Sequence, residues 1–153
     1  MSTRYEQDRA DVARFLPTNT VYHRIGEQDV WTFTKDTELQ VVFTISLYFC
    51  ADEDIPGYCA QLVSPTIEKA WQNIHVGHIF PDGVICLGGA SMRTRRTLRE
   101  AFAKSCLWAE GMAVMIRSRE VGQPSEFPFS ANNEEGEAYA GDAVLKPTGG
   151  RRG

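Results

Sequence analysis

A regular alternation of apolar and polar side chains over residues 38–50, ELQVVFTISLYFC, most constrains how this chain can fold. The side chains of one parity are all apolar: Leu39, Val41, Phe43, Ile45, Leu47 and Phe49. The other parity is mainly polar: Gln40, Thr44, Ser46 and Tyr48. Because successive side chains of a strand point to opposite faces, this alternation predicts a β-strand with one buried face. Such a strand needs a second layer to cover its apolar side.

Neighbouring segments predict further strands of the same sheet. Residues 20–25, TVYHRI, and residues 29–34, DVWTFT, flank a short turn and predict a hairpin. Residues 58–63, YCAQLV, follow the polar turn ADEDIPG and predict another short strand. Together these segments predict an antiparallel meander of about four strands, with one face available for packing.

A first helix is predicted at the N-terminus, where Thr3 and Glu6 fit a capping box and Pro17 ends the helical pattern. Its apolar face is expected to consist of Tyr5, Val12, Phe15 and Leu16. Since this face is narrow, we expect the helix to pack on the rim of the domain.

A long second helix is predicted to begin after a capping box formed by Thr97 and Glu100, and to continue to Ile116. Its apolar side chains recur at steps of three and four residues, which predicts a stripe that covers the sheet. Cys106 lies on this stripe and is predicted to be a core residue. Gly111 lowers the helix propensity by about 1 kcal/mol relative to alanine, and therefore indicates close packing at that point.

Length, composition and charge are those of one globular domain. The chain has 153 residues, of which 42% are hydrophobic and 24% charged. Its net charge of −4 argues against a general nucleic-acid-binding protein. The longest apolar stretch is too short to span a bilayer, and the N-terminal segment lacks the apolar core of a secretory signal. We therefore expect a cytoplasmic protein whose partners are neither nucleic acids nor membranes.

Four cysteines, at positions 50, 59, 86 and 106, occur without a CxxC pair. Zinc sites usually place their ligands in closely spaced pairs, so no metal site is predicted, although His75 and His78 precede Cys86. No cofactor is expected either. In the cytosol these thiols would stay reduced.

Cys86 lies near the end of a segment, residues 66–90, that follows no period for long. Irregular segments of this length are uncommon inside compact domains and are often functional. A sharp turn ending at Gly83 precedes the cysteine, and Gly88 and Gly89 follow it. The two glycines would leave room beside the thiol for an extended peptide tail. A cysteine between isoleucine and leucine is also typical of a buried strand, so a core role in an unrelated fold stays open.

The pentapeptide Gly83-Val84-Ile85-Cys86-Leu87 resembles the G-x-I-C-L signature of ubiquitin-conjugating enzymes. That family carries His-Pro-Asn-Ile upstream, with the asparagine eight residues before the cysteine. Here the corresponding tetrapeptide is Val76-Gly77-His78-Ile79, so His78 stands at the asparagine position. The downstream Trp-Pro pair is absent, Gly88 replaces an acidic residue, and the family's two C-terminal helices are missing or reduced. These departures resemble the trimmed bacterial relatives found in antiviral defence operons.

The resemblance implies an α+β, UBC-like conjugating domain over residues 1–122. Residues 123–153 would be a C-terminal extension with a short helix over NNEEGEAYAGDAV and then a flexible tail. The implied activity is that of a transferase: Cys86 accepts the C-terminal glycine of a ubiquitin-like protein from an activating enzyme as a thioester. An amine, usually a lysine of a target protein, then attacks the thioester. The target could instead be the C-terminus of a second-messenger synthase.

The resemblance and the local sequence together give the expected roles of the site residues. His78 would donate a hydrogen bond to the oxyanion, act as a base or hold the loop. Gly83, Gly88 and Gly89 would shape the segment around Cys86. A catalytically inactive module that only binds a ubiquitin-like protein or a peptide tail is the alternative function.

Other polar residues near this segment have less specific interpretations. The arginines at positions 93, 95, 96 and 99 form a basic run that is either a solvated helix start or a docking surface for an acidic partner. His75 is expected in a loop and His23 in a strand. The terminal GGRRG is typical of a flexible tail, although a conjugatable di-glycine end is an alternative.

Overall fold

The apolar alternation of residues 38–50 forms the third strand of a four-stranded antiparallel sheet. In chain order the strands are β1 (Val21–Ile25), β2 (Gln28–Asp36), β3 (Val42–Cys50) and β4 (Gly57–Ser64). Their spatial order is also β1-β2-β3-β4, which confirms the predicted meander. The structure is a computed structural model, and it describes residues 4–128.

The inward side chains of β3 form the centre of the core. Phe43, Ile45 and Leu47 are fully buried, as the alternation predicts. The strand begins later than predicted, because Thr37 closes a turn through two hydrogen bonds with the Val41 backbone. Leu39 lies in this turn and is exposed, so its predicted place on the buried face is wrong.

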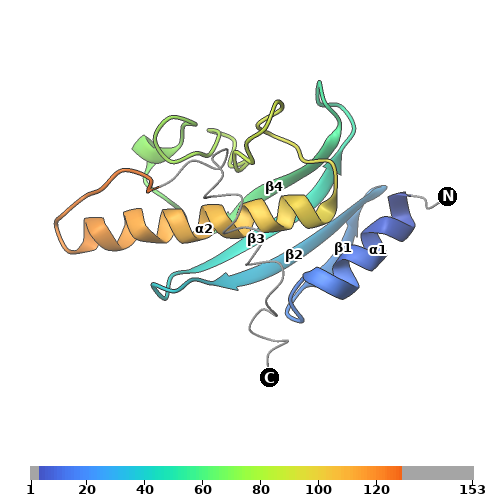
Figure 1. The fold of residues 1–153 in the computed structure, drawn as a ribbon, viewed down its shortest axis with the longest axis horizontal. Helices are drawn as coiled ribbons and strands as arrows, with labels where there is room; N and C mark the ends of the chain where they lie inside the picture. Colours follow the sequence, from blue (N-terminus) through green and yellow to red (C-terminus); the bar gives the residue numbers. More distant parts are fainter. Residues whose placement is uncertain (1–3, 129–153) are drawn as a thin grey trace.

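The long helix α2 (Leu98–Glu120) covers the inner face of the sheet (Figure 1). Thr97 caps it by accepting a hydrogen bond of 3.1 Å from the Glu100 backbone N–H, as the capping box predicts. The Trp108 ring meets the Phe43 ring edge-on, with 5.5 Å between centroids. Cys106 is buried in this interface, which confirms its predicted core position. The α+β architecture, with one helix before the four-stranded antiparallel sheet in the chain and a long helix after it, is therefore confirmed.

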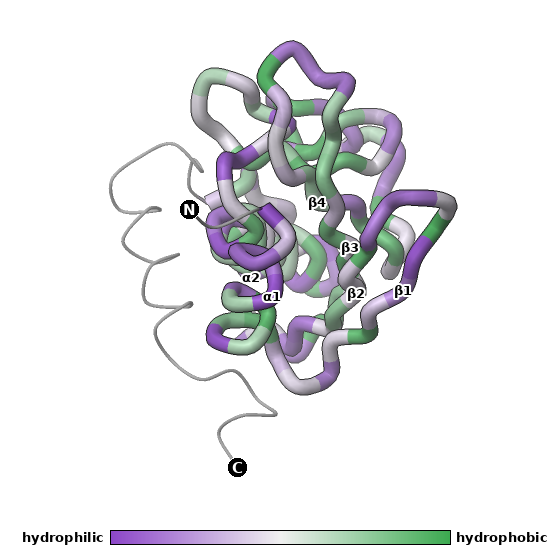
Figure 2. The backbone as a smooth tube through the Cα atoms, turned by 90° about the vertical axis from the view of Figure 1, so that its right-hand side faces the viewer, coloured by the Kyte–Doolittle hydropathy of each residue, from purple (hydrophilic) through white to green (hydrophobic). Residues whose placement is uncertain are grey.

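The short helix α1 (Arg4–Phe15) lies on the same side of the sheet as α2 (Figure 2). Leu16 is buried as predicted, but Tyr5 is 58% exposed, so its assignment to the buried face is wrong. The buried helical residues are instead Asp8 and Asp11. Each carboxylate accepts a hydrogen bond from a residue far away in the sequence, which makes its burial possible. Thr3 lies outside the described residues.

Polar contacts join α1 to the rest of the fold. Asp8 accepts a hydrogen bond from the hydroxyl of Tyr58 on β4. Burial raises the pKa of Asp8, and the hydrogen bond from Tyr58 opposes this shift. Asp11 accepts a hydrogen bond of 3.1 Å from the Arg99 backbone N–H, in the first turn of α2. A carboxylate at a helix N-terminus is favourable, because the free N–H groups there carry partial positive charge.

The irregular segment between β4 and α2 contains one 3₁₀ helix, η1 (Lys69–Trp71), and isolated bridges rather than a named strand. Residues 121–128, which follow α2, contain no helix. The predicted helix over NNEEGEAYAGDAV and the GGRRG tail fall outside the described residues. Among residues 4–128, no helix is both long and apolar enough to cross a membrane.

Candidate functional site

Cys86 lies in a segment that first follows the free edge of β4 and then leaves it. The Leu62 N–H donates to the Gly83 carbonyl at 2.9 Å, and the Ile85 N–H donates to the Ala60 carbonyl at 2.8 Å. After Ile85 the chain diverges from the strand. Cys86 therefore stands where the extended sheet edge ends and a loop begins.

Two other stretches of the irregular segment hold Cys86 in place. Its backbone N–H donates to the His78 carbonyl at 3.0 Å, and Ile79 and Ile85 form a β-bridge beside that bond. On the other side, the Leu87 N–H donates to the Met92 carbonyl at 2.7 Å. The structure thus brings the backbones of Cys86 and His78 together, across eight residues of sequence.

The accessibility of the Cys86 residue is small. It is 7% exposed, whereas its neighbours Ile85 and Leu87 are both 0% exposed. Cys86 therefore lies just beneath the surface and is slightly more exposed than its two neighbours. It is nevertheless less exposed than a readily accessible nucleophile would be. Burial raises the pKa of the Cys86 thiol, and a hydrogen bond from the Gly88 backbone partly lowers it. At neutral pH the thiol is protonated in this conformation.

The predicted glycines all adopt positive φ angles, which other residues rarely take. The angles are 89° at Gly83, 76° at Gly88 and 77° at Gly89. A Cβ at Gly83 would overlap the Gln61 side-chain amide. At Gly89 a Cβ would lie 2.8 Å from the Arg95 guanidinium. The room expected beside Gly89 is therefore bordered by the Arg95 guanidinium, a neighbour that the sequence pattern did not reveal.

The backbone at His78 is held in an unusual conformation. Its φ is 54°, which is uncommon for a residue with a side chain. The preceding carbonyl, that of Gly77, accepts a hydrogen bond of 2.8 Å from the buried Trp108 indole of α2. A Cβ at Gly77 would overlap the Trp71 carbonyl oxygen, so this position needs a glycine. Helix α2 therefore anchors the loop directly before the imidazole.

The His78 ring is half-buried, and its environment favours the neutral form. Burial lowers the pKa of His78, and the nearby His75 lowers it further. A neutral imidazole has one nitrogen that donates and one that accepts a hydrogen bond. The Phe127 ring lies against it, with 4.5 Å between centroids and an interplanar angle of 45°. Sequence analysis did not identify Phe127; the only signal was Gly111, against which the Phe127 ring packs.

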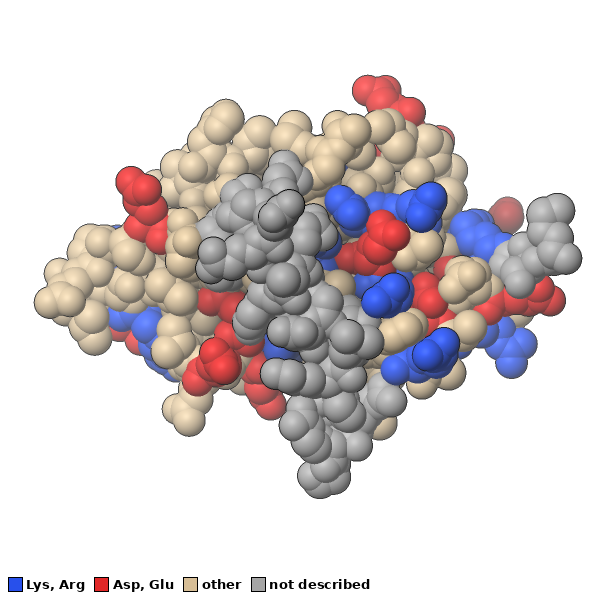
Figure 3. Space-filling view, in the orientation of Figure 1, with Lys and Arg blue, Asp and Glu red and all other residues tan. Residues whose placement is uncertain are grey.

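Two arginines of the basic run, Arg93 and Arg95, form ion pairs with neighbouring carboxylates. Arg93 pairs with Asp82 at 3.1 Å and stacks on the Phe80 ring, 4.1 Å from its centroid. Arg95 pairs with Glu100 at 3.4 Å. Lys and Arg side chains gather on the right half of the face in Figure 3, with Asp and Glu side chains between them. These pairs tie the turn before Cys86 and the start of α2 in place, which is a structural role.

Two neighbouring thiols, Cys50 and Cys59, lie outside the predicted site. The register of β3 and β4 sets Tyr48 opposite Cys59 and Cys50 opposite Gly57, so the two cysteines are diagonal neighbours. A hydrogen bond from Cys59 lowers the pKa of Cys50, and the same bond raises the pKa of Cys59. Cys50 is also less buried than Cys86, so it is the more reactive thiol toward small reagents.

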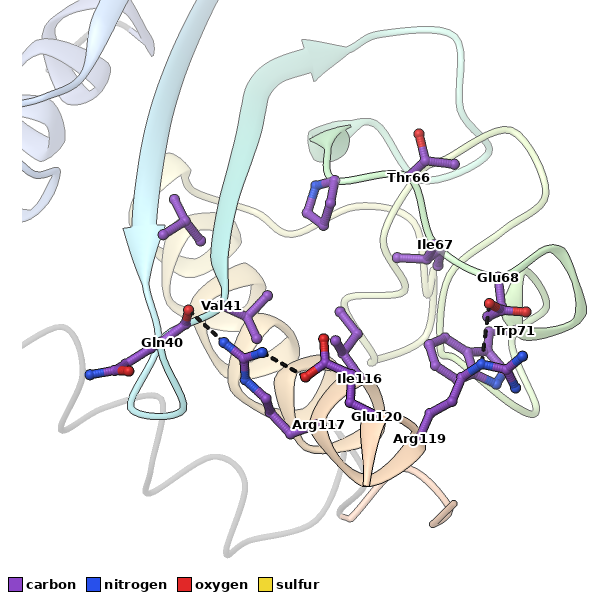
Figure 4. A pocket seen from close by; sticks show the side chains of 12 residues that line it. Gln40, Val41, Thr66, Ile67, Glu68, Trp71, Ile116, Arg117, Arg119 and Glu120 are labelled. Atoms are coloured by element: carbon purple, nitrogen blue, oxygen red, sulfur yellow. Dashed lines mark hydrogen bonds and ion pairs between the residues drawn. The ribbon is translucent and has the colours of Figure 1, made fainter. Parts of the chain in front are cut away.

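A cavity of about 580 Å³ lies between the β2–β3 turn, the segment after β4 and the C-terminal end of α2 (Figure 4). Ile67, Trp71 and Ile116 supply its apolar wall. The charges at its rim are already paired: Arg119 contacts Glu68 at 3.3 Å, and Arg117 contacts Glu120 at 2.7 Å. Neither Cys86 nor His78 lines this cavity.

Known proteins provide no assignment for this geometry. No protein-family model, curated protein or solved structure matches the chain. Within the part of the chain that the structure describes, no cluster of three or more His, Cys, Asp or Glu side chains could hold a metal ion.

Proposed function

We propose that the protein is a ubiquitin-conjugating-enzyme-like transferase that carries a ubiquitin-like protein as a thioester on Cys86. Its partners would be the ubiquitin-like protein, an activating enzyme, and a target with an acceptor lysine or the C-terminus of a second-messenger synthase. We place this activity in the bacterial cytoplasm, in an antiviral defence pathway. The UBC-like signature around Cys86 motivates this proposal.

One observation carries the proposal: the hydrogen bond between the Cys86 N–H and the His78 carbonyl. This bond brings together the backbones of the two residues whose side chains the sequence nominates for acyl transfer, although neither residue belongs to a helix or named strand. The order of elements supports the same conclusion, since a helix and a meander precede this segment and a long helix follows it. Left-handed glycines on both sides of Cys86 make this loop conformation possible.

The chemistry consists of two acyl transfers. The Cys86 thiol first loses its proton to solvent. The resulting thiolate then attacks the thioester on the activating enzyme: a new C–S bond forms, the old C–S bond breaks, and the activating enzyme's cysteine leaves as a thiolate. A neutral amine then attacks the carbonyl carbon, an amide bond forms, and Cys86 leaves as a thiolate. The proton lost by the amine passes to solvent or to His78. A donor to the oxyanion typically contributes about 10²–10³ in rate, and the neutral His78 ring can be that donor.

The test is a charging reaction with the cognate ubiquitin-like protein and its activating enzyme. With ATP present, the wild-type chain should acquire the modifier in an adduct that is lost on addition of a thiol reductant. Cys86→Ala should form no adduct. Cys50→Ser is the matched control, because it removes the more reactive thiol outside the site and should charge normally. An adduct on Cys86→Ala, or none on the wild type, would defeat the proposal.

The burial of Cys86 favours one alternative, a binding module without catalysis. A thiol with a raised pKa and 7% residue exposure is a poor nucleophile until the loop opens. In Cys50→Ser, alkylation of Cys86 in the native protein distinguishes the two functions. Labelling that outpaces global unfolding supports the transferase. Labelling only after unfolding supports a module that binds the modifier noncovalently.

A further inference from the structure

The segment after α2 turns back across the helix toward the candidate site. Gly122 has a φ of 76° and ends the helix, with its N–H bonded to the Arg119 carbonyl at 3.0 Å. Figure 1 shows the orange segment after α2 returning toward the green loop between β4 and α2. This return carries Phe127 from beyond the end of α2 to a position beside His78.

The Phe127 ring packs directly against α2 at Gly111. A Cβ built at Gly111 would overlap this ring, with ring atoms at 2.6 and 2.8 Å among the nearest. Any other residue at position 111 would therefore displace the ring or shift the helix. The packing of the Phe127 ring thus explains why a glycine stands at position 111, in the interior of a long helix where glycine lowers helix propensity.

The seated ring meets the His78 imidazole from the side of α2. The 4.5 Å between centroids is direct van der Waals contact, and it excludes water from that part of the imidazole. Trp108, one turn of α2 before Gly111, holds the Gly77 carbonyl next to the same histidine. Two contacts from α2 and its extension therefore converge on one side chain: one fixes its backbone, the other contacts its ring.

We propose that Phe127 is a positioning residue for His78, which it holds in the orientation needed for transfer of the acyl group from Cys86. The proposal rests on the proposed function. In this role Phe127 acts by restricting the imidazole. A misplacement of about 1 Å in a catalytic group can cost about 10²-fold in rate, so loss of such a contact is measurable.

The structural half of the proposal is tested by NMR, independently of activity. The His78 ring protons in the wild type should carry a ring-current shift that Phe127→Ala and Phe127→Leu both abolish. Phe127→Tyr should retain it. Val121→Ala is the matched control, because it truncates an exposed side chain of the same segment. Unchanged His78 shifts in Phe127→Ala would overturn the proposal.

The functional half is tested by single-turnover discharge of the purified Cys86 thioester to free lysine. Phe127→Ala should slow discharge by about ten-fold or more, whereas Phe127→Tyr and Val121→Ala should discharge at the wild-type rate. Phe127→Leu preserves bulk and serves if the alanine variant does not fold; it should also be slow.

The outcomes separate this inference from the proposed function. If the wild type does not charge, the proposed function fails and this role fails with it. If the wild type charges, and Phe127→Ala and Phe127→Leu discharge normally, only the positioning role is overturned. Faster discharge in these variants would also overturn it, since Phe127 would then be a cover that restrains transfer.

Discussion

Gly111→Ala should change the sign of its effect on stability according to whether Phe127 is present. Alanine is better than glycine in a helix interior by about 1 kcal/mol. In this chain, however, the new Cβ would lie well under 3.0 Å from the Phe127 ring. Overpacking of this kind typically costs about 1–3 kcal/mol. The net effect in the wild type should be a destabilisation of about 0–2 kcal/mol.

Removal of the ring removes the conflict. In a Phe127→Ala background, Gly111→Ala should therefore raise the free energy of unfolding by about 1 kcal/mol, the helix-propensity term alone. Urea unfolding of the four proteins, followed by circular dichroism, completes a double-mutant cycle. The expected coupling is about 1–3 kcal/mol. Equal stabilisation by Gly111→Ala in both backgrounds would contradict the packing of the Phe127 ring against Gly111. It would thereby also remove the physical basis for the contact between Phe127 and His78.

Three further predictions concern buried polar groups. Asp8→Ala should lower the free energy of unfolding by about 1–3 kcal/mol, because it leaves the Tyr58 hydroxyl without its acceptor; Asp8→Asn should cost less in the same urea titration, and an equal cost would contradict this. Trp108→Phe should lower the free energy of unfolding by about 1–3 kcal/mol, since the buried Gly77 carbonyl loses its donor. A urea midpoint equal to that of the wild type would contradict the importance of this hydrogen bond. Burial raises the pKa of the Cys106 thiol to about 12, so the stability it provides is complete below pH 9.0 and is lost as pH rises toward 12. The difference in urea midpoint between wild type and Cys106→Ala should therefore shrink over this pH range, and a constant difference would contradict the burial argument.

Side-chain periodicity predicted the elements whose partners are close in sequence or repeat regularly. Phe43, Ile45 and Leu47 alternate because one face of β3 is buried, and this signal is present in the local sequence. The cap of α2 was likewise predictable, because Thr97 and Glu100 lie within one turn of each other. Such features need no knowledge of the rest of the chain.

The contacts of α1 were not predictable in this way. Its exposed Tyr5 and buried Asp8 reverse the usual preference of these residue types. The reason is Tyr58, fifty positions away along the chain, whose hydroxyl satisfies the carboxylate. The spacing of apolar residues contains no information about distant hydrogen-bond donors. It therefore could not show that Asp8 would be buried and Tyr5 exposed.

The candidate site shows the same division. The motif around Cys86 predicted which cysteine and which histidine to consider, and the structure joins their backbones. The resemblance implied an accessible thiol, whereas the apolar neighbours Ile85 and Leu87 left burial open; the low exposure of Cys86 agrees with the second expectation and depends on how the whole irregular segment packs. The motif did not predict Phe127 or the guanidinium of Arg95 beside Gly89, because both reach the site from separate segments. Gly111 indicated close packing, but not which residue would pack there.

The most direct test of the central claim is the chemical nature of the bond formed at position 86. Intact-mass analysis after charging should show one modifier on the wild type, lost on treatment with a thiol reductant. Cys86→Ser should carry the same added mass as an oxyester, which resists the reductant and is cleaved by mild alkali. A reductant-resistant adduct on the wild type, or an adduct of unchanged lability on Cys86→Ser, would contradict acyl transfer through Cys86.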